Sequence, residues 1–157
     1  MPPQFLFDLS AIDLTKVQFD HDAVRALNPQ RGHMEHLDGI IWADPANGNI
    51  LGYKDVRADE FWVDGHIPGR PLLPGVIMIE AAAQLSSFYT KQFEKWTGFI
   101  GFGGVEDCKF RAEVKPGSRM LVLVHKTWER HRRIGCQTQG VVNGNLVFEA
   151  TVIGSQM

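Results

Sequence analysis

Cysteine is scarce in this sequence, because only Cys108 and Cys136 occur among its 157 residues. The two do not form a C-x-x-C pair, and they belong to no set of residues with the spacing of metal ligands. So little cysteine is typical of a protein that stays reduced inside the cell. We therefore expect a cytoplasmic protein with free thiols and no metal site.

Long hydrophobic runs and an excess of one charge are also lacking. The longest apolar run, around residues 76–85, is far too short to cross a bilayer and contains Glu80. Residues 1–14 include acidic side chains and no basic stretch before an apolar core, so they do not resemble a signal peptide. The formal net charge of -2 gives no general attraction to nucleic acid or to an anionic membrane. We therefore expect no nucleic-acid partner, no binding to a membrane surface and no membrane-spanning segment.

What the chain does have is enough apolar sequence for one domain. Hydrophobic residues make up 44% and charged residues 22%, which is typical of a globular protein. No repeat, low-complexity segment or linker divides the sequence, so we predict a single domain over residues 1–157. Residues 1–26 read as an amphipathic lead-in, with a short helix over 20–27.

Two groups of strands are expected, one before and one after a long helix in the sequence. Alternating apolar and β-branched residues predict strands at 40–44, 49–56, 60–63, 99–110, 119–130, 133–142 and 145–154. Turn residues separate several of them, at Asn47-Gly48, Pro116-Gly117 and Asn143-Gly144.

The long helix is expected to begin after three prolines, Pro68, Pro71 and Pro74. From Pro74 to about Trp96 no residue breaks a helix. Its first turns, residues 76–83, are apolar nearly all round, which is typical of a helix buried on most sides. A curved antiparallel β-sheet wrapped around one long central helix satisfies this pattern. We therefore predict an α+β domain with the hot-dog fold.

Glu80 is the ionisable residue inside this apolar stretch. If the helix is buried, the carboxylate loses water, and it must either find a partner or keep its proton. A carboxylic acid that stays protonated near neutral pH can donate a proton to a substrate. The alternative is that Glu80 lies on the exposed stripe of a less buried helix. Periodicity leaves both interpretations open.

His66 and Gly75 are the other two candidate residues. Histidine can act as a base near neutral pH, although a loop histidine can also serve only as a hydrogen-bonding group. Gly75 stands at the helix start, where backbone N–H groups lack intrahelical partners and a ligand carbonyl can approach closely. It is therefore a candidate oxyanion site. The alternative role for Gly75 is turn geometry alone.

The stretch GHIPGRPLLPGVIMIEAAAQ, residues 65–84, resembles the active-site motif of the β-hydroxyacyl-acyl carrier protein dehydratases. Ile67 stands where that family usually has Phe. The matching positions follow without a gap and are Gly65, His66, Pro68, Pro71, Pro74, Gly75, Val76, Glu80, Ala81, Ala83 and Gln84.

The likeness continues outside the motif. Segments 104–118 and 142–152 resemble later parts of the family pattern, and three upstream residues also fit it, namely Pro29, Arg31 and Asp38. The resemblance therefore covers roughly residues 27–154 and leaves residues 1–26 unexplained. Where the family has an apolar segment, residues 32–37 read GHMEHL.

The resemblance implies a hot-dog homodimer or trimer of dimers that acts on acyl carrier protein in fatty acid biosynthesis. It implies dehydration of the (3R)-3-hydroxyacyl thioester to the trans-2-enoyl thioester, at a site with His66 from one chain and Glu80 from the other. His66 would remove the C2 proton, Glu80 would protonate or position the departing hydroxyl, and the Gly75 N–H would polarise the carbonyl. Gln84 and Val76 would support them. No cofactor is implied, because the thioester itself acidifies the C2 proton.

Other functions stay open at this point. A hot-dog thioesterase, or a hydratase acting on acyl-CoA, would share the fold, and release of a thiol would distinguish the thioesterase. A non-catalytic acyl-binding module would be free to lose His66 or Glu80, and both are present. A metal site at His33, Glu35 and His36 is not expected, because their spacing matches no standard ligand set.

Docking of a strongly acidic carrier protein would need a local basic patch, because the chain is slightly acidic overall. The densest basic run holds Arg130, His131, Arg132 and Arg133. Its alternative interpretation is a solvated hairpin turn. Lys91 and Lys95, late on the predicted helix, form a second candidate patch.

Overall fold

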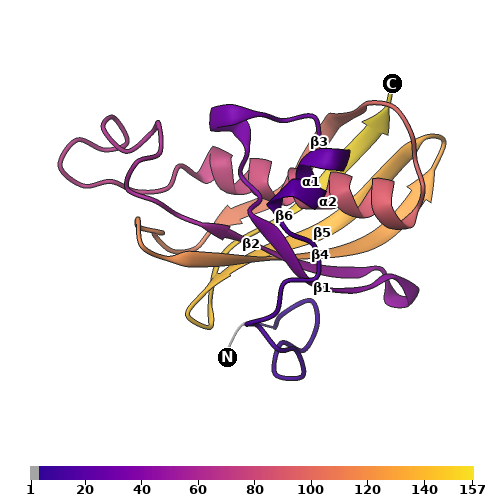
Figure 1. The fold of residues 1–157 in the computed structure, drawn as a ribbon, viewed down its shortest axis with the longest axis horizontal. Coiled ribbons are helices and arrows are strands. Elements are labelled where there is room, and N and C mark those ends of the chain that lie inside the picture. The colour runs from indigo at the N-terminus through magenta and orange to yellow at the C-terminus, as the bar shows by residue number, and fades with distance from the viewer. Residues whose placement is uncertain (1–3) are drawn as a thin grey trace.

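The computed structural model describes residues 4–157 and shows a six-stranded antiparallel sheet packed against one long helix (Figure 1). The strands are β1 (Gly39–Asp44), β2 (Asn49–Asp55), β3 (Ile100–Phe110), β4 (Arg119–Arg130), β5 (Arg133–Val142) and β6 (Asn145–Gln156). They lie in the order β1-β2-β4-β5-β6-β3, and every neighbouring pair is antiparallel. This is the α+β hot-dog fold that the sequence predicts.

The long helix is α2 (Gly75–Phe93), and Pro74 occupies its N-cap position, where a missing N–H costs no hydrogen bond. It ends earlier than the predicted Trp96, because Lys95 adopts a left-handed backbone with φ 60° that a helix cannot continue. Its buried face packs against the sheet and includes Ala81, Leu85 and Phe88. Its first turn is less buried than predicted, since Val76 is 69% exposed.

The predicted strand at 60–63 is wrong, because these residues form a turn. The Val63 N–H donates to the Glu60 carbonyl over 3.2 Å, and the His66 N–H donates to the Trp62 carbonyl over 2.8 Å. Aromatic and β-branched residues gave this stretch the appearance of a strand. Its backbone bonds are instead local, and no strand of the described sheet pairs with it.

The N-terminal segment covers the face of the sheet opposite α2. Alternating strand residues place a second apolar cluster there, formed by Ile41, Leu51, Leu123 and Val141. Side chains between Phe5 and Ile12 pack on this cluster. The part of the lead-in that the structure describes therefore has a structural role, whereas residues 1–3 lie outside the described chain.

Three short helical turns complete the fold. The expected helix at 20–27 is present as α1 (His21–Leu27), and its N-cap Asp20 accepts a hydrogen bond from the Ala23 N–H over 2.9 Å. The 3-10 turns η1 (Gly32–Met34) and η2 (Pro45–Asn47) flank β1. Over residues 4–157, no helix is long and apolar enough to cross a membrane.

Candidate active site

Glu80 lies in the second turn of α2, half-buried, beside a cavity of about 190 Å³ between α2 and the sheet. The wall from the helix includes Ala83 and Ser87, and the wall from the sheet includes Phe102 and Val152. Burial raises the pKa of the Glu80 carboxyl, and hydrogen bonding from the Gln84 amide opposes this only in part. Burial therefore makes Glu80 a weaker acid than an exposed glutamate, next to a space that a ligand can enter.

Gln84 lies one helical turn after Glu80 and is only 3% exposed. Its Oε1 accepts the His36 N–H over 2.9 Å, and its Nε2 donates to the Met34 carbonyl over 2.7 Å. Its own carbonyl accepts a hydrogen bond from the side chain of Asn28. Gln84 thus fixes the segment before β1 onto α2, in addition to its contact with Glu80.

His66 sits in the loop between β2 and α2, where its side chain is exposed. Its Nδ1 lies 2.8 Å from the Leu72 carbonyl oxygen. Because a carbonyl can only accept, Nδ1 carries the proton, and Nε2 is left with a free lone pair. This tautomer is the one in which Nε2 can act as a base.

His66 and Glu80 do not meet within one chain. No hydrogen bond or ion pair joins the two side chains in residues 4–157, and His66 does not line the cavity beside Glu80. A site that uses both residues would therefore need a second copy of the chain.

The start of α2 offers free backbone donors. In the part of the chain that the structure describes, the N–H groups of Gly75 and Val76 have no hydrogen-bond partner. A Cβ at position 75 would lie 2.7 Å from Cε1 of Phe110, so glycine is the residue that fits beneath that ring. These donors at the positive end of the helix suit a developing oxyanion.

The two cysteines do not supply a nucleophile. Burial raises the pKa of the Cys136 thiol to about 12, although a hydrogen bond from Ser86 acts in the opposite direction. Burial also raises the pKa of the Cys108 thiol. Both thiols are free, and both are held in the protonated, unreactive form.

His33, Glu35 and His36 do not come together as a ligand set. The Glu35 carboxylate faces Arg25 and His21, at 2.8 and 3.3 Å. The His36 ring is buried elsewhere, against Lys54 and Glu60. Among residues 4–157, no group of three or more His, Cys, Asp or Glu side chains could hold a metal ion.

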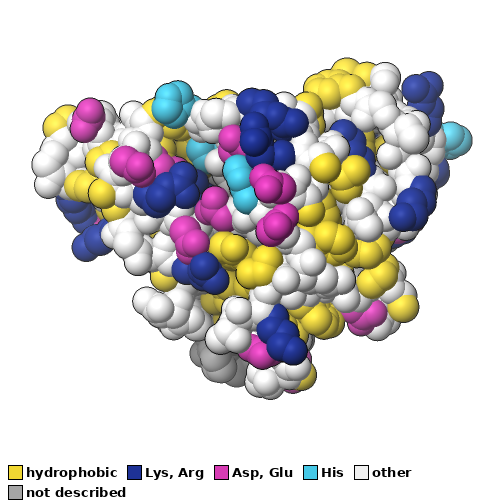
Figure 2. All heavy atoms as spheres, viewed as in Figure 1, with side chains coloured by type: hydrophobic (Ala, Val, Ile, Leu, Met, Phe, Trp, Pro, Cys, Tyr) yellow, Lys and Arg dark blue, Asp and Glu magenta, His cyan; other side chains and the backbone are white. Residues whose placement is uncertain are grey.

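The basic run at 130–133 forms the exposed turn between β4 and β5. His131 and Arg132 have φ values of 51° and 63°, as a two-residue hairpin loop requires. Figure 2 shows basic side chains gathered at that end of the molecule. Lys91, from the second candidate patch, instead donates to the Leu27 carbonyl over 2.9 Å, which leaves it less available to a partner.

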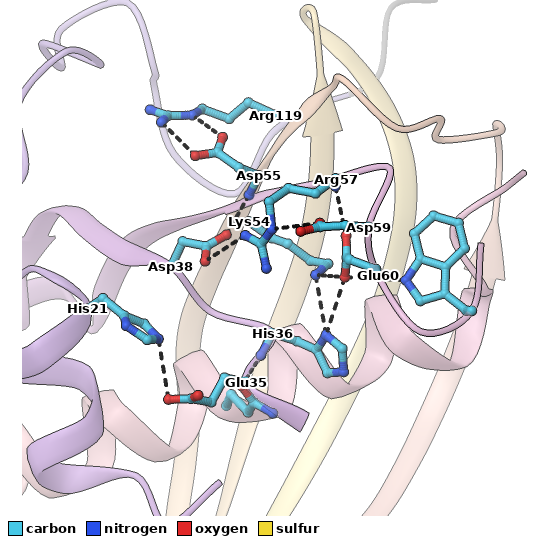
Figure 3. Close-up of polar contacts among 12 residues, drawn as sticks. His21, Glu35, His36, Asp38, Lys54, Asp55, Arg57, Asp59, Glu60 and Arg119 are labelled. Carbon is cyan, nitrogen blue, oxygen red and sulfur yellow. Dashed lines mark hydrogen bonds and ion pairs between the residues drawn. The ribbon is translucent and has the colours of Figure 1, made fainter. Parts of the chain in front are cut away.

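Sequence reasoning missed a buried polar cluster of Lys54, Glu60 and His36 (Figure 3). A signal for it exists in β2, where Ile50, Gly52 and Lys54 share the face toward the core. A lysine whose side chain points into the core needs a buried acceptor or carboxylate near its ammonium group.

Comparison with known proteins settles the family. The family pattern of the FabA-like domain matches residues 28–151, which is most of the chain. The chain belongs to the FabA-like family. Within this family it is similar to the 3-hydroxyacyl-[acyl-carrier-protein] dehydratase FabZ of Desulfotalea psychrophila, at 31% identity over 90% of this chain and 96% of the relative. The enzyme of the same name from Listeria monocytogenes is 31% identical over 85% of this chain and 93% of its own length.

Solved structures agree on the fold of this FabA-like chain. The dehydratase heterocomplex ApeI:P from Xenorhabdus doucetiae superposes with a TM-score of 0.70, at 15% sequence identity, over 85% of this chain and 90% of the other. At that identity the likeness concerns the fold alone. It supports the assignment of the hot-dog architecture.

Proposed function

We propose that this protein is a 3-hydroxyacyl-[acyl-carrier-protein] dehydratase of fatty acid biosynthesis. It removes water from a (3R)-3-hydroxyacyl thioester on acyl carrier protein and forms the trans-2-enoyl thioester. Membership of the FabA-like family and two relatives with that activity in their names support the assignment. The free state of both cysteines supports a reducing, cytoplasmic setting.

The position of Glu80 is the observation that carries this proposal. A carboxyl whose pKa is raised by burial, beside a cavity, is suited to donate a proton to a substrate that binds there. Loss of the 3-hydroxyl needs such a donor, because hydroxide is a poor leaving group and water is a good one.

The proposed roles balance the protons of the reaction. His66 Nε2 takes the proton from C2. The electron pair of the broken C2–H bond forms the C2=C3 double bond. Glu80 delivers its proton to the C3 hydroxyl, and the C–O bond breaks to release water. The free N–H of Gly75 polarises the thioester carbonyl, which stabilises the charge that develops there. The thioester acidifies C2, so no metal or organic cofactor takes part in the proposed reaction.

We further infer a composite site in a homodimer, alone or within a trimer of dimers. The support is an open sheet edge at β3, which carries exposed apolar side chains at Phe102 and Phe110. Val76 and Ile67, near the helix start and beside His66, are also exposed. A second copy that covers these surfaces could bring its His66 to the Glu80 of the first.

The test is an assay with matched 3-hydroxyacyl thioesters on acyl carrier protein and on coenzyme A. Formation of the conjugated enoyl thioester is followed by its absorbance, and free thiol is measured in parallel. We expect enoyl product without thiol release, and faster turnover on the carrier-bound form. Thiol release without enoyl product would identify a thioesterase and overturn the proposal.

A further inference from the structure

A pair of buried opposite charges lies between β2 and the turn that precedes His66 (Figure 3). The side chains of Lys54 and Glu60 are 1% and 6% exposed, and Lys54 Nζ donates to Glu60 Oε1 over 2.7 Å. The same Nζ lies 3.2 Å from Nδ1 of His36, which is also 1% exposed. Since an ammonium only donates, His36 Nδ1 accepts, and the ring is neutral.

Such a pair is not explained by stability alone. Burying two charges is unfavourable unless both are fully hydrogen-bonded, and apolar residues of similar volume often serve equally well. Glu60 meets this condition by accepting three hydrogen bonds, one from Lys54 and two from the turn. Its Oε1 accepts from Lys54 and from Trp62 Nε1 at 3.2 Å, and its Oε2 accepts the Arg57 N–H over 2.8 Å. One carboxylate therefore fixes both ends of the turn 57–62 to strand β2.

The turn 57–62 also holds the backbone of His66. The Trp62 carbonyl accepts the N–H groups of both Gly65 and His66, at 3.2 and 2.8 Å. Trp62 is 5% exposed and belongs to the hydrophobic core, and its indole N–H bonds to Glu60, so the pair and the core together fix its position. On its other side, His66 bonds to Leu72 through its ring and through its carbonyl. His66 itself is exposed, and this chain of contacts is what places it.

We propose that the buried pair Lys54–Glu60 is a positioning pair for His66, acting through Trp62. This inference rests on the proposed function, in which His66 is the base. The pair touches no part of the cavity beside Glu80, so its effect falls on the orientation of the base rather than on substrate binding.

The central experiment is the double variant Lys54→Met with Glu60→Gln, which removes both charges and leaves no charge buried alone. We expect it to fold, with kcat about 10–100-fold lower than wild type, because a displacement of about 1 Å can cost that much. KM should stay within about 3-fold of wild type, since the cavity is intact.

The matched control is a second ion pair, between Asp55, the residue after Lys54 on β2, and Arg119 on β4. Arg119 and Asp55 bond at 2.7 and 3.0 Å and are partly exposed, and within residues 4–157 neither side chain forms a hydrogen bond or ion pair with the turn 57–62. The variant Arg119→Met with Asp55→Asn should leave kcat within about 2-fold of wild type. Equal losses in both double variants would mean a general effect on stability and would overturn the proposal.

A second measurement does not depend on catalysis. In the wild type the His66 amide is bonded to Trp62, so its hydrogen exchange should be slow, and the ring ¹⁵N shifts should report a proton on Nδ1. The Lys54–Glu60 double variant should speed exchange at His66 and shift the ring toward the Nε2-protonated form. The Arg119–Asp55 control should do neither.

The outcomes separate the two proposals. If the wild type does not dehydrate any thioester but the His66 exchange changes as expected, the function is wrong and the positioning is right. If activity is present, and both kcat and His66 exchange are unchanged in the double variant, the positioning is wrong. Should the double variant fail to fold, Trp62→Phe removes the indole N–H that binds Glu60, together with part of the buried ring, and leaves both charges in place. An unchanged kcat and unchanged His66 exchange in that variant would then overturn the positioning proposal.

Discussion

At the scale of single residues, the proposed chemistry depends on His66, which accepts one proton, and on Glu80, which donates one. His66→Ala and Glu80→Gln should each lower turnover by about 10²–10⁴-fold, which is the usual contribution of general acid–base catalysis. Circular dichroism and thermal melting should show that both variants stay folded, since neither side chain is part of the fully buried core. Turnover close to wild type in both variants would rule out their roles.

His36 gives a second residue-scale prediction, which concerns stability against pH. Burial lowers the pKa of His36 to about 4, the charges of Lys54 and Arg57 act in the same direction, and Glu60 opposes them. Between about pH 6.5 and pH 4 the unfolded chain binds a proton at His36 that the folded chain does not. Stability should therefore fall as pH falls through this window, by up to about 3 kcal/mol.

Comparison with His36→Leu isolates this contribution. Urea unfolding at pH 7, 5.5 and 4.5 should show a weaker loss of stability for the variant than for wild type. Glu80, whose pKa is raised, acts in the opposite direction in the same window, but it is present in both proteins and cancels in the difference. Identical pH slopes would show that His36 takes its proton as readily in the folded protein as in the unfolded one.

At the scale of elements, one side chain of β5 hydrogen-bonds the N-terminal segment to the sheet, in addition to the apolar packing there. Gln139 accepts the Leu6 N–H through Oε1 over 2.9 Å and donates to the Gln4 carbonyl over 3.0 Å. Gln139→Ala should lower the free energy of unfolding by about 1–3 kcal/mol, the contribution of two hydrogen bonds. It should also speed limited proteolysis within residues 4–12. Turnover should not change, because this segment lies on the face opposite α2.

The control for this prediction is Gln137→Ala. Gln137 lies two residues earlier on the same strand, but it is exposed and its side chain makes no hydrogen bond in residues 4–157. Proteolysis that speeds up equally in both variants would contradict the role assigned to Gln139.

At the scale of the whole molecule, the proposed composite site predicts complementation between inactive variants. His66→Ala and Glu80→Gln chains that are mixed and allowed to exchange subunits should form heterodimers with one intact site. About half of the dimers would be mixed, so activity should recover to roughly a quarter of wild type. Sedimentation should show a dimer or a multiple of it. Confirmed subunit exchange without recovery would argue against a site shared between chains.

Carrier docking is the second prediction at this scale. If the exposed turn 130–133 binds an acidic carrier, replacing Arg132 and Arg133 with Ala should raise KM for the carrier-bound substrate by roughly 3–10-fold. The rate with a small thioester analogue should stay the same, and added salt should weaken only the carrier reaction. Lys16→Ala, at an exposed lysine of the N-terminal segment, is the control. An equal loss on both substrates would assign the patch to folding instead.

The sequence alone determined the features that depend on neighbours along the chain. The turns, the six strands and the helix start after Pro74 follow from local spacing and backbone preference, and the family resemblance rests on the residues of the motif at 65–84. Only the tertiary structure decided that 60–63 is a turn, because its aromatic and β-branched residues suit a strand equally well and no strand of the described sheet pairs with them. It also placed the N-terminal segment on the sheet and opened a cavity beside Glu80. The N-terminal contacts and the cavity join residues distant in sequence, and burial over such distances leaves no local pattern to read.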